Sequence, residues 1–164
     1  MNMGQDIVYP NNTVIVEDNG LVIEEFEVGA NATPAKMLPG TWVIYDTVAG
    51  NVKEAGAEAV GVIGVLMEKP TGALTDYPAV GDQIRVVTGG NGKVMLRRGV
   101  SGGAIVPGTP LVTMADGLTG NQTVGAMGTQ GEIVAIGAVI LGDSTAEANV
   151  VATMHKSILS LAAS

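Results

Sequence analysis

The chain has no cysteine and a single histidine, His155, among its 164 residues. Disulfide frameworks, thiol nucleophiles and thiolate metal sites are therefore excluded, and only one side chain is available as an imidazole base. That histidine lies near the C-terminus, and no paired carboxylate can be identified for it, so catalysis through it is not expected. We expect no enzymatic activity, no metal site and no cofactor.

Basic residues are also scarce. Eight lysines and arginines stand against sixteen acidic residues, which gives a net charge of −8 and a pI near 4.4. The average field of such a chain repels phosphate backbones, so nucleic-acid binding is not expected. No apolar run approaches the ~18 residues that span a bilayer. The N-terminal residues lack the basic and apolar regions of a secretion signal. We therefore expect no membrane association and synthesis in the cytoplasm without export.

Aromatic residues are few, with one Trp, one Phe and three Tyr, so the core must be built from Val, Ile, Leu, Ala and Met. Hydrophobic residues make up 46% of the chain and charged residues 15%, a composition that excludes disorder throughout. Glycine is abundant, with 24 residues, which is about twice the average usage of ~7%. These glycines follow no three-residue period, so collagen is excluded. The length corresponds to one ordinary domain.

Short β-like runs alternate with turn signals from residue 21 onward. Turns recur about every ten residues, which is the spacing of an all-β sandwich or small barrel. The strongest local prediction is a hairpin over Gln83–Leu96, because the glycines of Gly89–Gly92 supply the positive φ angles of a tight turn. The expected strands are Leu21–Val28, Thr41–Tyr45, Val60–Met67, Gln83–Thr88, Lys93–Leu96, Pro110–Met114 and Ile133–Leu141.

The sequence also repeats itself weakly. Pro39-Gly40-Thr41 recurs as Pro107-Gly108-Thr109, and the apolar run Val62–Leu66 recurs as Ala135–Val139. The offset is 68 residues at the first feature and 73 at the last, so a short insertion separates the copies. This pattern favours a barrel built by duplicating a small β-unit.

The two ends of the chain differ from the middle. Residues 1–20 are polar and rich in Asn, and they read as an extended arm with at most one short strand near Thr13–Val16. Over residues 145–162 the signals conflict. Ser144–Glu147 has capping-box spacing and apolar residues from Val150 onward fall at helical spacing, which together favour a helix. Val150, Ala152 and Met154 also alternate as a strand would, so both alternatives stay open.

Two features suggest contacts with a partner. Lys93, Arg97 and Arg98 form the only basic cluster of an acidic chain, and they fit either an exposed strand end or a contact with an acidic partner or a second copy. Trp42 is the only tryptophan. It is either a packing anchor of the core or an interface anchor, because Trp is enriched at binding hot spots.

Three glutamates form the densest acidic group. Glu25 and Glu27 would share one face of a strand, with Glu24 on the other. A calcium cage needs more ligands from several segments. A solvated strand face is therefore the favoured interpretation.

The order of the glycine and valine motifs carries a resemblance. The motifs are Pro39–Val43, Gly50–Ala55, Ala59–Val62, Val80–Val86, Val106–Val112, Asp116-Gly117 and Ile136–Val139. In this order they resemble the small β-barrel capsid cement (head decoration) proteins of tailed bacterial and archaeal viruses. The resemblance covers roughly residues 21–155 and consists of residue patterns, not signature residues.

The resemblance implies an all-β decoration domain over residues 21–155, between an N-terminal arm of residues 1–20 and a short tail of residues 156–164. It implies that Asn149–His155 is the closing strand. It also implies a virion structural protein, made in the host cytoplasm, that binds the outer surface of an icosahedral capsid and stabilises it. The partners would be the major capsid protein and other copies of the chain in a homotrimer. The alternative is another virion surface component, such as a fibre or spike base, or a glycan-binding β-module.

Capsid or subunit contacts are expected first from the arm, because its apolar residues stand in a polar and extended segment. Arg97 and Arg98 are the second choice, and Trp42 is a further candidate. The arm residues are Ile7, Val8, Tyr9, Val14 and Ile15.

Overall fold

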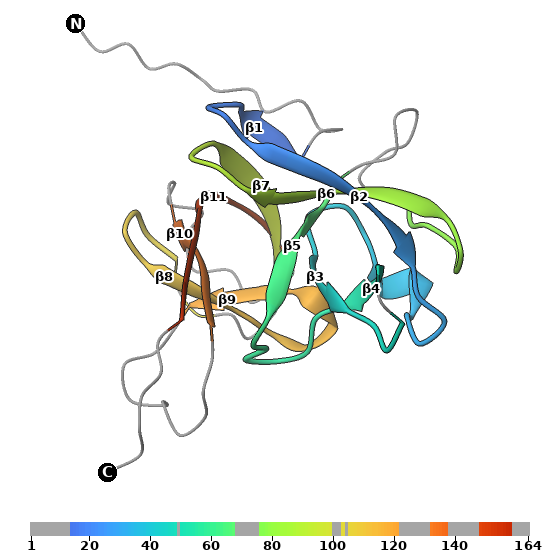
Figure 1. Ribbon diagram of the computed structural model, residues 1–164. Coiled ribbons are helices and arrows are strands. Elements are labelled where there is room, and N and C mark those ends of the chain that lie inside the picture. Colours follow the sequence, from blue (N-terminus) through green and yellow to red (C-terminus); the bar gives the residue numbers. More distant parts are fainter. Residues whose placement is uncertain are drawn as a thin grey trace, which may run out of the picture.

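The computed structural model describes residues 14–48, 50–67, 76–99, 103, 105–121, 132–137 and 148–158. These residues form strands and two short 3-10 turns, η1 (Pro34–Lys36) and η2 (Ala115–Gly117), so the all-β fold class is confirmed (Figure 1). The strands are β1 (Ile15–Glu17), β2 (Val22–Val28), β3 (Trp42–Tyr45), β4 (Asn51–Glu54), β5 (Val62–Leu66), β6 (Gln83–Gly89), β7 (Lys93–Arg98), β8 (Pro110–Thr113), β9 (Thr119–Asn121), β10 (Glu132–Gly137) and β11 (Ala148–Ile158).

The strands build two barrels that lie side by side (Figure 1). The first is a closed barrel in the order β2-β4-β3-β5-β6. The second begins as a six-stranded sheet in the order β1-β7-β11-β10-β8-β9, and a further pairing of β7 with β9 closes five of these strands into a ring. Strand β1 is added outside that ring, on β7.

The two barrels have the same topology. In each, the first and third strands pair in parallel and all other neighbours are antiparallel. The five strands from β2 to β6 of the first barrel therefore correspond, in chain order, to the five strands from β7 to β11 of the second. Each copy of the sequence repeat therefore forms a complete five-stranded barrel. The sequence pattern favoured a single barrel made from two copies of a smaller unit.

Equivalent hydrogen bonds fix this correspondence. The amide of Gly40 donates to the carbonyl of Leu66 at 2.9 Å, and that of Gly108 donates to Gly137 at 2.8 Å. Leu66 and Gly137 are 71 residues apart, so the offset of 73 residues inferred for the last apolar runs is wrong by two. The sequence alone could not show this, because both runs are apolar and tolerate a shift of two residues.

The hairpin predicted over Gln83–Leu96 is also corrected. β6 pairs with β2 and β5, whereas β7 pairs with β11, β1 and β9. The glycine turn between β6 and β7 is therefore the crossing from one barrel to the other. Gly90 is needed there because a Cβ atom would collide with the carbonyl oxygen of Gly20 in the β1–β2 turn. Close packing against the β1–β2 turn, not a hairpin between β6 and β7, explains Gly90.

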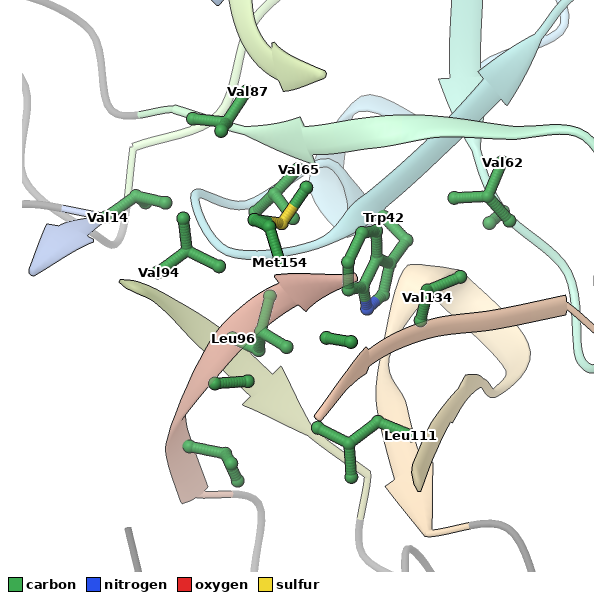
Figure 2. Packing of buried hydrophobic residues seen from close by; sticks show 14 of the residues in the cluster. Val14, Trp42, Val62, Val65, Val87, Val94, Leu96, Leu111, Val134 and Met154 are labelled. Atoms are coloured by element: carbon green, nitrogen blue, oxygen red, sulfur yellow. The ribbon is translucent and has the colours of Figure 1, made fainter. Parts of the chain in front are cut away.

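Two hydrophobic clusters fill the molecule. The first barrel encloses Val28, Met37, Val43, Val52, Ile63, Leu66, Ile84 and Val86. A larger cluster fills the second barrel and continues into the junction between the barrels (Figure 2). Strand β5 contributes side chains to both clusters. Ile63 and Leu66 belong to the cluster of the first barrel, whereas Val62 and Val65 belong to the larger cluster. One strand with two buried faces thus links the two interiors.

The C-terminal ambiguity is resolved in favour of a strand. Val150, Ala152 and Met154 lie buried on one face of β11, and Val151 is buried on the other. β11 pairs with β7 on one edge and β10 on the other, and this pairing outweighs the local helical spacing. The helix is wrong for residues 148–158, and β11 continues past 155 into the expected tail. Residues 145–147 and 159–162 lie outside the described residues.

Candidate functional site

Trp42 is the centre of the junction between the barrels. Its side chain is 0% exposed, and its Nε1–H donates to Thr119 Oγ1 at 2.8 Å. In Figure 2 its ring lies between Met154 and Val134, which both come from the second barrel. Of the two alternatives for Trp42, the structure supports the packing anchor. The interface that it fills lies within the molecule.

Main-chain hydrogen bonds reinforce this junction. The amide of Arg97 donates to the carbonyl of Gly40 at 3.0 Å, and the amide of Glu58 donates to that of Thr113 at 2.8 Å. On the surface, Lys36 Nζ and Asp116 Oδ1 form an ion pair of 2.6 Å between η1 and η2. Main-chain hydrogen bonds, a surface ion pair and a shared core thus join the two barrels.

A groove of about 420 Å³ opens beside the junction. Its charged side chains are already engaged: Glu54 Oε2 accepts the amide of Thr33 at 2.9 Å, and Asp116 is paired with Lys36. The remaining lining comes largely from small residues such as Ala55, Gly56 and Ala57. The groove therefore has the character of a seam between two barrels, not of a prepared ligand site.

Asp46 is the most strongly held carboxylate. Its side chain is 1% exposed and accepts hydrogen bonds from the amide and Nδ2 of Asn31, both at 3.0 Å, and from the amide of Thr47 at 2.8 Å. The Asn31 hydrogen bonds are the main cause that lowers the pKa of Asp46 to about 2. Lys53 Nζ lies 3.5 Å away and acts in the same direction. This carboxylate ties the β3–β4 turn to the loop after β2, so its role is structural.

The expected arm contacts divide into two groups. Ile7, Val8 and Tyr9 lie outside the described residues. Val14 is 0% exposed, and its carbonyl accepts the amide of Met95 at 2.8 Å, while Ile15 is half-buried opposite Val94 in β1. The structure thus uses the base of the arm to hold the second barrel.

The basic cluster does not form one exposed patch. Arg98 is 1% exposed, Arg97 is half-buried, and Lys93 forms an ion pair with Glu17 of β1. The alternation of β7 separates Arg97 from Arg98, because successive side chains point to opposite faces of a strand. Arg98 and Trp42 both lie in the interior of the molecule.

Sequence reasoning missed most of the exposed apolar side chains. Tyr45, at the end of β3, is 56% exposed, and Val48, in the turn after it, is 58% exposed. Tyr77 and Val80 are each 50% exposed before β6. The Tyr45 ring meets Phe26 edge-on, with centroids 6.1 Å apart. Only the tyrosines could be singled out from sequence, because an isolated valine in a loop carries no signal of its exposure. Among the described residues, the other large apolar side chains that are exposed are Val22, Ile23, Val60 and Val106.

Other chemistry is limited in the part of the chain that the structure describes. There, no group of three or more His, Asp or Glu side chains is placed to hold a metal ion. Glu24 and Glu25 are exposed on β2, as expected for a solvated strand face. His155 lies on β11, and its side chain is outside the described set. Across the same ranges, no helix has the length and apolar character to cross a membrane.

Comparisons with known proteins give a structural likeness but no family. No family model matches the chain, and no curated protein matches it. Among solved structures, the chain is similar to the N base of the head fiber gp8.5 of bacteriophage phi29. The TM-score is 0.49 at 12% identity, over 86% of this chain and 99% of that chain. At this TM-score and identity, the function has to be argued from the chain itself.

Proposed function

We propose that the chain is a virion structural protein that binds the outer surface of an icosahedral capsid as a homotrimer and stabilises the shell. Its partners are the major capsid protein and two further copies of itself. Each copy makes a modest contact across capsid subunit joints, and symmetry converts several weak contacts into avidity. The mechanism uses no catalytic residue and no cofactor.

The observation that carries the proposal is the fusion of two closed barrels through one core. A cement protein has to act as a stiff clamp, and Trp42 and Val65 belong to a cluster that spans both barrels. The main-chain hydrogen bond from the amide of Arg97 to the carbonyl of Gly40 braces the same junction. The motif order that resembles cement proteins lies in these same barrels, which supports the same assignment.

A fibre or spike base is the second candidate, because exposed apolar side chains at Tyr45, Val48, Tyr77 and Val80 suit the mounting of another protein. The two candidates differ in effect. Cement raises the temperature at which a shell releases its contents, whereas a base binds the shell and leaves that temperature unchanged.

The test is a binding assay on shells of the virus that encodes the chain, prepared without this protein. We expect full-length protein to sediment with the shells and to raise their disruption temperature. A truncation of residues 1–12 should remove binding, because it deletes Ile7, Val8 and Tyr9 but keeps the buried Val14. A longer cut through residue 16 is unsuitable, since it would take away Val14 and most of β1.

Two outcomes would count against the proposal. Unchanged binding by the short truncation would remove the arm from the contact, and absence of any shell binding would remove the function itself. The trimer is tested separately by light scattering. We expect a mass near three times 16.6 kDa, on the shell if not in solution.

A further inference from the structure

Among the described residues, no strand pairs with one edge of β2 along its first half. Residues Val22–Glu27 pair with β6 on one side, but β4 pairs with the other side only at Glu27 and Val28. The amide of Val28 donates towards β6, to Asp82, and that of Gly29 donates to Val52 of β4. Because these directions alternate along a strand, the backbone groups of Ile23 and Glu25 point to the side that β4 does not reach.

The equivalent edge of the second barrel is covered. Gly29 and Gly99 make matching hydrogen bonds, to Val52 and Thr119, and counting back four residues from each makes Glu25 equivalent to Met95. The amide of Met95 donates to the carbonyl of Val14 beside β1. Strand β1 lies outside the two repeats. The duplicated fold therefore has two equivalent strand edges, one on β2 and one on β7, but the described residues contain one extra strand, β1, which covers the edge of β7.

Exposure and charge describe what would fit the open edge. Val22 is 51% and Ile23 41% exposed, whereas Met95 at the covered edge is 7% exposed. Glu24 and Glu25 are exposed beside them, with Arg85 of β6 as the cation opposite Glu25. A strand that brings apolar and basic side chains would bury Val22 and Ile23 and would complement the charges of Glu24 and Glu25. A β2 strand from a second copy would bring carboxylates against carboxylates, which destabilises cross-strand pairs.

We propose that the β2 edge from Ile23 to Glu25 accepts an extended strand from a partner protein that carries Lys or Arg beside apolar residues. Main-chain hydrogen bonds supply the affinity of such strand addition, and side-chain complementarity supplies its specificity. The inference stands on the internal repeat of the fold and does not require that the partner belong to a capsid.

The test uses the full chain and a short blocked peptide of alternating lysine and valine. Amide hydrogen exchange by NMR should show exchange at Ile23 and Glu25 slowed about tenfold at saturating peptide. Amides that already bond to β6, such as that of Phe26, should change little. A matched peptide of alternating glutamate and valine should give no protection.

Two variants complete the test. Glu25→Pro removes an N–H that points away from β6, so the β2–β6 ladder is kept and peptide protection should vanish. Glu25→Lys keeps the backbone and should weaken the lysine peptide in favour of the glutamate peptide. Protection that survives Glu25→Pro, or equal binding of both peptides, would overturn the proposal. Strong protection of the Ile23 and Glu25 amides in the absence of peptide would also overturn it, because the edge would then already be covered. If that protection rises with protein concentration, the cover is a second copy; if it does not, the cover is another segment of this chain.

Discussion

Trp42 joins the barrels through both parts of its side chain. The indole ring packs in the cluster that spans the junction, and the Nε1–H donates to Thr119 across it. The lone tryptophan of a chain poor in aromatics was recognisable from sequence as an anchor, but not as one between two halves of the same molecule. That distinction depends on which strands close around it, and local pattern does not contain this information.

Replacing Trp42 should therefore destabilise the whole fold. We expect Trp42→Ala to lower the free energy of unfolding by about 3–5 kcal/mol. Thr119→Val keeps the volume but leaves the indole N–H without its acceptor, and should cost about 1–3 kcal/mol. Urea unfolding followed by far-UV circular dichroism measures both. If Trp42→Ala had the same free energy of unfolding as the wild type, packing at the junction would not stabilise the fold.

Asp46 gives a pH dependence of known sign. Its pKa in the folded protein is about 2, below the ordinary value of 3.8. A carboxyl with a depressed pKa stabilises the fold above its unfolded pKa, and this stabilisation is lost as pH falls between about 4 and 2. Asp46→Asn should lower stability at neutral pH and flatten the loss of stability in that acid window. Parallel acid-unfolding curves for the two proteins would contradict this role.

Among the elements, the strands that sequence analysis found and missed differ in a physical way. Most of the found strands bury at least two apolar side chains each, although β2 buries only Val28. β4 has only Val52 buried, and β9, Thr119–Asn121, contains no large apolar residue. These two strands make the parallel pairings that close each barrel. The hydrophobic pattern of the sequence therefore could not predict that the barrels close, because closure depends on backbone hydrogen bonds.

Loss of β11 should open the second barrel, because one of its edges pairs with β7 and the other with β10. A truncation of residues 150–164 should expose the edges of β7 and β10 and give an aggregating protein. The matched control removes residues 159–164 and keeps every described pairing of β11, so it should stay folded. Size-exclusion chromatography and circular dichroism report the difference, and a soluble, folded product of the longer cut would refute the assignment.

At the scale of the whole molecule, the internal repeat could be detected from Pro39-Gly40-Thr41 and its second copy, although its meaning could not. Two repeats with separate cores would be two domains. Here Val65 of the first barrel and Leu96 of the second lie in one cluster, so the repeats share a core.

A shared core predicts one cooperative unfolding transition. Trp42 fluorescence and far-UV circular dichroism should give coincident urea curves, because neither barrel keeps its buried surface without the other. A variant with a polar residue at the junction, Val65→Asn, should shift the curve to lower urea without splitting it. Two separated transitions would show that the barrels are independent.

The pairing of β1 with β7 has a consequence for synthesis on the ribosome. β1 is held by a strand that starts at Lys93, and Val14 packs in a cluster that includes Met154 of β11. The first barrel is contiguous in sequence, but its outward-facing Trp42 and Val65 wait for strands β10 and β11, which follow it in the chain. During that interval a nascent chain carries an apolar face without its cover, and neighbouring ribosomes carry the same face. Slow, non-local closure of this kind makes aggregation during translation the main hazard of expressing this fold.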